Sequence, residues 1–128
     1  MILPKPVEFL GSALQALRAF PDHARREAGH QIDRVQRGLE PDDWKPMTAV
    51  GPGVREIRIR ETNGAFRILY LTKMADAIYV LHCFEKKTQK TSQADLELAA
   101  MRYAPALDRM APPYRASAAR CRGRYRSR

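Results

Sequence analysis

The chain has 128 residues and a formal net charge of +9, enough length for one domain with a modest hydrophobic core. No stretch approaches the roughly 18 uncharged apolar residues of a membrane helix, and the N-terminus lacks the apolar run and cleavage site of a secretory signal, so we expect a cytoplasmic protein. Cys83 lies in an apolar run and Cys121 in a basic tail, a placement that favours neither disulfides nor zinc, so we expect no metal and no other cofactor.

The positive charge is unevenly distributed along the chain. Residues 114–128 contain six arginines and no acid, whereas residues 45–90 carry nine basic and four acidic groups. A local basic segment suits a polyanion such as RNA, although a solvated charged surface has the same composition. The sequence has no Gly-rich phosphate loop, no paired carboxylates in an obvious cleft and no nucleophile elbow, which argues against ATP use, glycoside hydrolysis and serine hydrolysis.

The first third of the chain predicts a helical hairpin. Residues 7–10 suit a short edge strand, and the apolar residues from Leu10 to Leu17 recur at helical spacing until Pro21. Asp22 is a suitable N-cap for a second helix, and Gly38 stands where a left-handed residue often ends one. The apolar face of that second helix is formed by Ala28, Ile32, Val35 and Leu39.

The middle of the chain predicts three antiparallel strands. Residues 40–53 are rich in proline and glycine, and we expect an irregular loop whose Trp44 packs onto the core. The period then becomes strand-like over residues 54–60, and Asn63-Gly64 is a strong tight-turn signal before a return strand over 66–71. Residues 77–84 are apolar on both faces, as in a central strand.

The last third predicts one more helix and a tail. Ser92 and Asp95 resemble a capping box, and the helix that follows is expected to be interrupted at Pro105. Residues 1–112 then form one domain, and residues 113–128 a basic, disordered tail. Because strands and helices are segregated along the chain, we predict an α+β fold in which the helices cover one face of the sheet.

Cations are the residues most suggestive of chemistry. Arg58 and Arg60 share one strand face, Arg67 follows the tight turn on the next strand, and Lys86, Lys87 and Lys90 follow the third strand. Arginines bind phosphate in a bidentate manner and keep their charge when partly buried, so such a cluster could hold RNA and stabilise a phosphorane-like transition state. Ordinary ion pairs of Arg58 with Glu56 or Glu61 are an equally good interpretation of the spacing.

Histidine and tyrosine residues allow further roles. His82 ends the third strand and could exchange protons near neutral pH, although a lone histidine in an apolar strand is more often a hydrogen-bonded core residue. Tyr70, Tyr79 and Tyr103 could stack on bases, but each fits a core position better.

Several of these segments together resemble a known family. Residues 54–60 (VREIRIR), 64–70 (GAFRILY) and 81–91 (LHCFEKKTQKT), followed by a helix with DLELA at 95–99, are similar to the phage-derived HigB branch of the RelE/ParE toxin superfamily. The resemblance covers residues 5–110 and includes WKPM at 44–47 in the loop. It implies a RelE-like single domain with two N-terminal helices on a small curved antiparallel sheet and a C-terminal helix.

The resemblance also implies a function. Such toxins of type II toxin-antitoxin systems cleave messenger RNA, in many cases on the ribosome, through metal-independent attack of the 2′-hydroxyl on the adjacent phosphate. A cognate antitoxin, in this branch a HigA-like helix-turn-helix protein, binds and neutralises the toxin. By position, Arg67 would bind the scissile phosphate, Arg58 would contribute to catalysis, and Lys87 or Lys86 would support the leaving group. Contacts to RNA or the ribosome would involve Arg60, Lys90 and Tyr70.

The chain departs from the family pattern at several positions. Glu56 stands where RelE has a lysine suggested as general base, so acid-base work would fall to another group, for which His82 is a candidate. The C-terminal tyrosine of some relatives could correspond to Tyr103. Two other functions stay open: a ParE-like poison of DNA gyrase, and a noncatalytic nucleic-acid-binding module.

Overall fold

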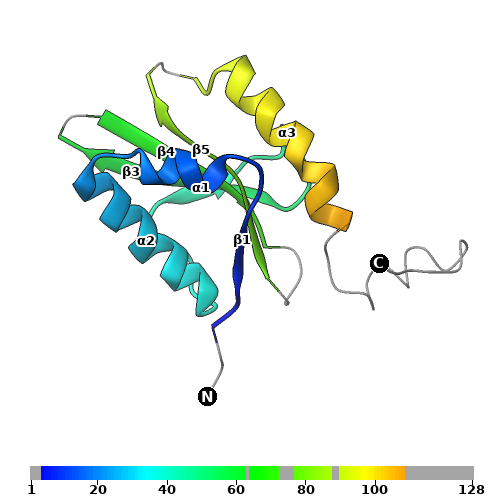
Figure 1. Cartoon of the computed structure of the whole chain (residues 1–128), viewed down its shortest axis with the longest axis horizontal. Helices are drawn as coiled ribbons and strands as arrows, with labels where there is room; N and C mark the ends of the chain where they lie inside the picture. Colours follow the sequence, from blue (N-terminus) through cyan, green and yellow to red (C-terminus); the bar gives the residue numbers. More distant parts are fainter. Residues whose placement is uncertain (1–3, 63, 73–76, 88–89, 109–128) are drawn as a thin grey trace, which may run out of the picture.

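The computed structural model describes residues 4–62, 64–72, 77–87 and 90–108, which fold into one five-stranded sheet and three helices (Figure 1). The predicted tail and Asn63 lie outside the described residues. The strands follow the order β1-β5-β4-β3-β2 across the sheet. In chain order the elements are β1 (Val7–Phe9), α1 (Ala13–Arg18), α2 (Asp22–Gln36), β2 (Trp44–Pro46), β3 (Val54–Glu61), β4 (Gly64–Leu71), β5 (Ile78–Lys86) and α3 (Gln93–Asp108).

The predicted α+β class and its three central strands are confirmed, but the sheet is mixed rather than antiparallel. β3, β4 and β5 form the antiparallel meander, whereas β1 lies parallel to β5. The expectation of an irregular loop over residues 40–53 is also wrong at its start, where β2 pairs antiparallel with β3. The main-chain bond from Arg58 to the carbonyl of Asp43 extends this pairing, because the open edge of β3 offers backbone partners that local composition does not reveal.

The helices also depart from the sequence-based expectations at their ends. Gly38 has the left-handed φ of 84° expected past the end of a helix, but α2 stops at Gln36 and Leu39 is 51% exposed instead of lying on its buried face. Pro105 lies inside α3 rather than interrupting it: the proline gives up an intrahelical hydrogen bond, but Ala106 beyond it is fully buried in the core. The predicted cap is present, with the Asp95 amide donating to Ser92 Oγ at 3.1 Å.

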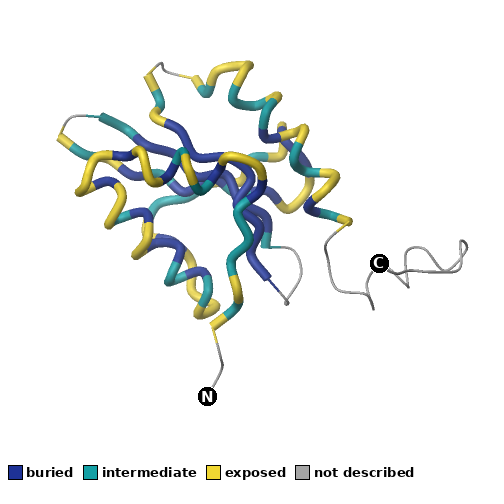
Figure 2. Tube along the Cα trace, viewed as in Figure 1, coloured by how far each residue is buried: buried dark blue, intermediate teal, exposed yellow. Residues whose placement is uncertain are grey.

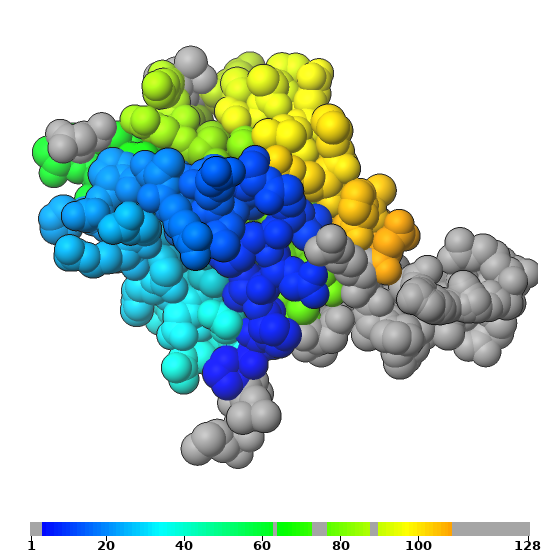
Figure 3. All heavy atoms as spheres, in the orientation of Figure 1, coloured from blue at the N-terminus to red at the C-terminus, as the bar shows by residue number. Residues whose placement is uncertain are grey.

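Helices cover both faces of the sheet, not one as predicted. One hydrophobic cluster joins α1 and α2 to the inward residues of the strands, including Ile57, Ile68 and Val80. A second cluster joins α3 to residues of the opposite face, such as Leu69 and Leu71. Figures 1 and 3 show α1 and α2 side by side over the sheet, and Figure 2 shows the strands buried between the helical layers. Strands that are apolar on both faces require this second cover. No helix within the described ranges could cross a membrane.

One extra residue in β5 decides which side chains face α3. Tyr70 lies opposite Val80, but its neighbour Leu69 lies opposite His82, so Leu81 is inserted as a β-bulge. Strict alternation from Val80 would turn His82 toward α1 and α2. The bulge turns His82, and after it Phe84 and Lys86, to the face of α3 instead.

Cys83 is buried on the other face of β5. Its thiol is expected to make the free energy of unfolding fall as pH rises into the alkaline range. Burial raises the pKa of the Cys83 thiol from 9.0 to about 12. Between these values the folded chain binds more protons than the unfolded chain, so the free energy of unfolding falls as pH rises, by at most about 1.4 kcal/mol per pH unit. Below pH 9 the contribution of the buried thiol to the free energy of unfolding is fully present. Urea unfolding of wild type and Cys83→Ala across this window checks it, and identical pH slopes would contradict it.

Candidate functional site

Basic side chains gather on the sheet face that α3 only partly covers. Arg58 lies directly opposite Arg67 across β3 and β4, and Arg60 and Lys86 flank Ala65 from the two neighbouring strands. Lys45 joins the same face from β2, opposite Glu56. Like charges placed opposite one another destabilise a sheet. Bringing these cations together therefore opposes folding unless a counter-charge or a ligand offsets it.

A buried carboxylate supplies the counter-charge. Glu56 is fully buried, and its Oε1 lies 3.7 Å from Arg67 Nε and 4.0 Å from Lys45 Nζ. The hydroxyl of Thr91, from the segment before α3, donates to Glu56 Oε2 at 3.3 Å. Among the described residues, no carboxylate lies within 4.0 Å of Arg58, so the simple pairs of Arg58 with Glu56 or Glu61 are not formed. Glu56 instead balances Arg67 and Lys45 from beneath.

Arg67 is the most buried cation of the cluster. It is 4% exposed, and its Nη1 donates a hydrogen bond to the carbonyl of Phe66 at 3.1 Å. Burial lowers the pKa of Arg67, Glu56 opposes that shift, and Arg58 adds to it. An arginine still carries its charge under such conditions. The structure thus holds a cation that is oriented before any ligand arrives.

Four buried polar atoms on this face have no hydrogen-bond partner among the described residues. They are Glu56 Oε1, Arg58 Nε, Arg67 Nε and His82 Nδ1. Buried polar groups of folded proteins are nearly always paired, so each exception calls for an explanation such as a functional role, a water or an ion. Arg67 Nε and Glu56 Oε1 face each other as an ion pair at 3.7 Å, whereas Arg58 Nε has no such partner and can donate to an anion, which marks this face rather than the opposite one as the candidate site.

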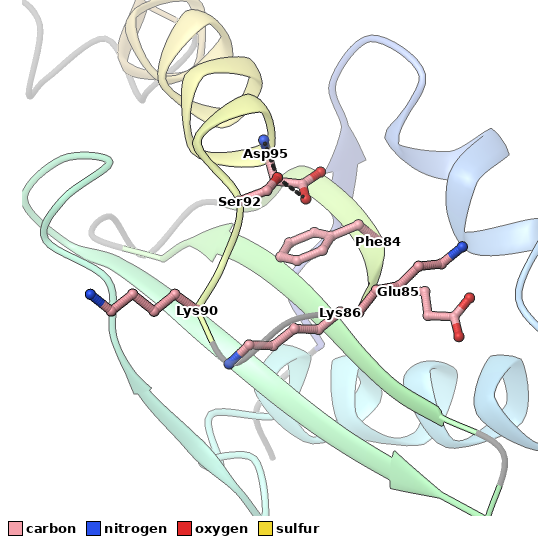
Figure 4. A pocket seen from close by; sticks show the side chains of 7 residues that line it. Phe84, Glu85, Lys86, Lys90, Ser92 and Asp95 are labelled. Atoms are coloured by element: carbon pink, nitrogen blue, oxygen red, sulfur yellow. Dashed lines mark hydrogen bonds between the residues drawn. The ribbon is translucent and has the colours of Figure 1, made fainter.

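A hollow of about 210 Å3 adjoins the cluster between the end of β5 and the first turn of α3. Figure 4 shows the ring of Phe84 in the middle, with Ser92 and Asp95 on one side and Lys86 and Lys90 toward the other. Its lining residues are Phe84, Glu85, Lys86, Lys87, Lys90, Ser92 and Asp95. Desolvation lowers the pKa of Lys86, and the neighbouring charge of Arg67 lowers it further. The hollow therefore adjoins the arginines, because Lys86 and Phe84 line it and Phe84 lies directly opposite Arg67.

His82 links the sheet to α3 beside this hollow. Its Nε2 lies 2.7 Å from Asp95 Oδ1, and the hydroxyl of Ser92 donates to Asp95 Oδ2 at 2.7 Å. The imidazole also stacks on Phe84, with ring centroids 5.0 Å apart and an interplanar angle of 20°. Because Nε2 is bonded to Asp95 and Nδ1 is buried, His82 holds Asp95 and Phe84 in place and is itself closed to a ligand in this arrangement.

The structure brings most, but not all, of the predicted site residues together. Lys87 and Lys90 are exposed at the hollow, and Arg60 is exposed beside the cluster. Tyr70 does not join them, because it is 1% exposed in the core that faces α1 and α2. Tyr103 packs on the loop before β3, where its hydroxyl donates to the carbonyl of Pro52 at 2.7 Å.

Three residues of the site carry no functional signal in the sequence. They are Lys45, in a segment that predicts a loop, Phe84, in a strand that predicts a core position, and Asp95, whose spacing from Ser92 indicates a helix cap. Glu56 departs from the family pattern, but its role as the buried partner of Arg67 becomes visible only in the structure. The alternation of β3 places Glu56 beside Arg58 and was the available signal, whereas the contacts of Asp95 depend on where α3 packs.

The arrangement is suited to binding and polarising a phosphate. Paired arginines offer several donors in fixed directions, and lysines near the hollow add mobile positive charge. In the part of the chain that the structure describes, no three potential metal ligands come together.

Comparison with known proteins agrees with this architecture. The model of a family described as "Phage derived protein Gp49-like" matches residues 15–104. Among solved structures, the chain resembles that of a double-arginine mutant of the E. coli toxin RelE in the free state, with a TM-score of 0.53 and 16% sequence identity over 85% of this chain and 100% of that chain. None of the curated proteins gives a significant match. At this identity the structural likeness establishes the fold.

Proposed function

The chain belongs to the phage-derived Gp49-like family and has the fold of RelE, and from this premise we propose that it is the toxin of a type II toxin-antitoxin system that cleaves messenger RNA. The observation that carries the proposal is the buried Arg67, paired with Glu56 and directly opposite Arg58, whose Nε makes no hydrogen bond and lies within 4.0 Å of no carboxylate among the described residues. Oriented donors in a site shielded from water stabilise a charged transition state strongly.

The proposed reaction is an internal transfer at phosphorus. The ribose 2′-oxygen bonds to the adjacent phosphorus while the bond to the 5′-oxygen breaks, leaving a 2′,3′-cyclic phosphate and a 5′-hydroxyl. Arg67 and Arg58 bind the non-bridging oxygens, whose negative charge rises in the transition state. Lys86 or Lys87 would assist protonation of the departing oxygen, and a base removes the 2′-hydroxyl proton. His82, the candidate that the sequence offers for this base, is bonded through Nε2 to Asp95 and would serve only after releasing that carboxylate.

Two partners follow from the same proposal. The message is expected to be cut while it is bound to a ribosome, where exposed Arg60 and Lys90 would contact RNA. A HigA-like helix-turn-helix antitoxin would bind the chain and suppress the cleavage. Both partners are testable with purified components.

Primer extension on a defined message, with and without programmed ribosomes, tests the proposed activity. Discrete cuts that appear only with ribosomes are expected, with 5′-hydroxyl and cyclic-phosphate ends and no dependence on added metal. An intact message in both reactions, from a folded chain, would overturn the nuclease proposal. A gyrase supercoiling assay run beside it would then show whether the chain acts as a ParE-like poison instead.

A further inference from the structure

The hollow beside Phe84 has the size of a single base. Pockets that take a drug-sized ligand span roughly 300–1000 Å3, and this one has about 210 Å3. It also lies next to the phosphate-binding arginines, because Phe84 is the direct cross-strand neighbour of Arg67 and Lys86 follows two residues later. A nucleotide whose phosphate rests on Arg67 could therefore place an adjoining base in the hollow.

Phe84 offers that base the edge of its ring that remains open to the hollow, since the residue as a whole is 8% exposed. One side of its ring is stacked on His82, which fixes the ring plane. The ring also lines the hollow and lies between Asp95 and Lys86 (Figure 4). Stacking of a base on an aromatic side chain is favourable for all four bases, so Phe84 contributes affinity without selecting among them.

Selection falls to Asp95. Its side chain is 27% exposed and lines the hollow, while His82 and Ser92 each engage one of its oxygens. A carboxylate has about four acceptor positions, so free acceptors remain on both oxygens. Ser92 has given its only hydroxyl proton to Asp95, so the polar wall formed by Ser92 and Asp95 accepts hydrogen bonds and does not donate them.

An all-acceptor wall favours one base. Guanine presents two neighbouring donors, N1–H and the N2 amino group, to a carboxylate. Adenine and cytosine present one amino donor beside a ring acceptor, and uracil presents one N–H between two carbonyls. A carboxylate facing the last three therefore meets at least one acceptor with its own lone pairs.

We propose that this hollow is a base-binding subsite next to the scissile phosphate, in which Phe84 stacks on the base and Asp95 selects guanine. The inference rests on the proposed RNA substrate, and it adds that the site recognises a guanine base next to the cleaved bond. His82 is then a positioning residue, because it orients both Phe84 and Asp95 without reaching the base itself.

Nucleotide binding to the full chain tests the subsite without requiring cleavage. NMR titrations with 5′-GMP, AMP, CMP and UMP are expected to show GMP bound on the order of tenfold more tightly than UMP, with shifts at residues 84–87 and 90–95. Asp95→Asn replaces one acceptor by a donor, so it should weaken GMP binding to the level of UMP and improve AMP or CMP. Glu97→Gln removes the same charge from an exposed position of α3 and should leave the order unchanged.

The outcomes separate this inference from the proposed function. Equal affinity of the wild type for all four nucleotides would overturn the subsite even if the chain cuts RNA. This wild-type comparison tests the subsite on its own if Asp95→Asn does not fold. A guanine preference that survives Asp95→Asn in a folded variant would equally overturn the role of Asp95. Selective GMP binding by a chain that cuts no message would leave the subsite standing and reject the nuclease.

Discussion

Replacing Arg67 with lysine is expected to lower kcat for message cleavage by about 10²- to 10³-fold, because the variant keeps the positive charge beside Glu56 but loses the fixed fork of donors. Ground-state binding of RNA depends on several cations, so KM should change much less than kcat. Single-turnover cleavage of a defined message on programmed ribosomes measures both constants. The split matters because a loss confined to kcat indicates donors that act mainly in the transition state.

A matched control tests whether any arginine-to-lysine substitution in this chain lowers cleavage. Arg25→Lys makes the same change at an exposed position of α2, where the guanidinium pairs with Asp22, and should leave cleavage unchanged. Thermal unfolding of both variants verifies that they are folded. Wild-type kcat in a folded Arg67→Lys variant would show that the guanidinium of Arg67 takes no special part in the reaction.

Replacing Glu56 with alanine is expected to lower the free energy of unfolding by about 3–5 kcal/mol, because it leaves Arg67 buried without its counter-charge. Repulsion from Arg58, directly opposite, then adds to the cost of burying Arg67. Inorganic phosphate should restore part of the loss, since an anion bound between the arginines takes the place of the carboxylate. Urea unfolding with and without phosphate measures both effects.

Glu61→Ala provides the control for this change. Glu61 lies on the same strand, three residues from Arg58, and forms no ion pair within 4.0 Å among the described residues. Its removal should change stability by no more than about 0.5 kcal/mol and should not alter the response to phosphate. Equal losses for the two variants would show that Glu56 does not balance the cluster.

The predictions for Arg67 and Glu56 are linked, because the Glu56 carboxylate and a bound phosphate compete for the same positive charge. A carboxylate beneath Arg67 holds the guanidinium in place, yet it also offsets part of the charge that would attract phosphate. Glu56 pairs with Arg67 and Lys45, but among the described residues no carboxylate lies within 4.0 Å of Arg58, so this offset is incomplete. Stability and phosphate affinity therefore draw on the same side chains, and Glu56→Gln is expected to bind phosphate more tightly than the wild type while unfolding more easily.

The sequence by itself determined the class of the fold, the family and the main cations. Alternation in β3 placed Arg58 and Arg60 on one face, and the Asn63-Gly64 signal placed Arg67 near them on the return strand. These features are local, since they depend on side-chain period and on the preferences of single residues. The match over residues 15–104 shows membership of the phage-derived Gp49-like family, and the likeness to RelE confirms the expected fold.

Tertiary structure alone decided how the site is completed. The bulge at Leu81 turns His82, Phe84 and Lys86 toward α3. The residue pattern of β5 does not predict this bulge. The parallel pairing of β1, the addition of β2 with Lys45 and the packing of α3 on the second face all join segments distant in sequence. Their placement depends on which apolar surfaces and backbone edges remain uncovered once the meander has formed, and only the folded chain specifies that.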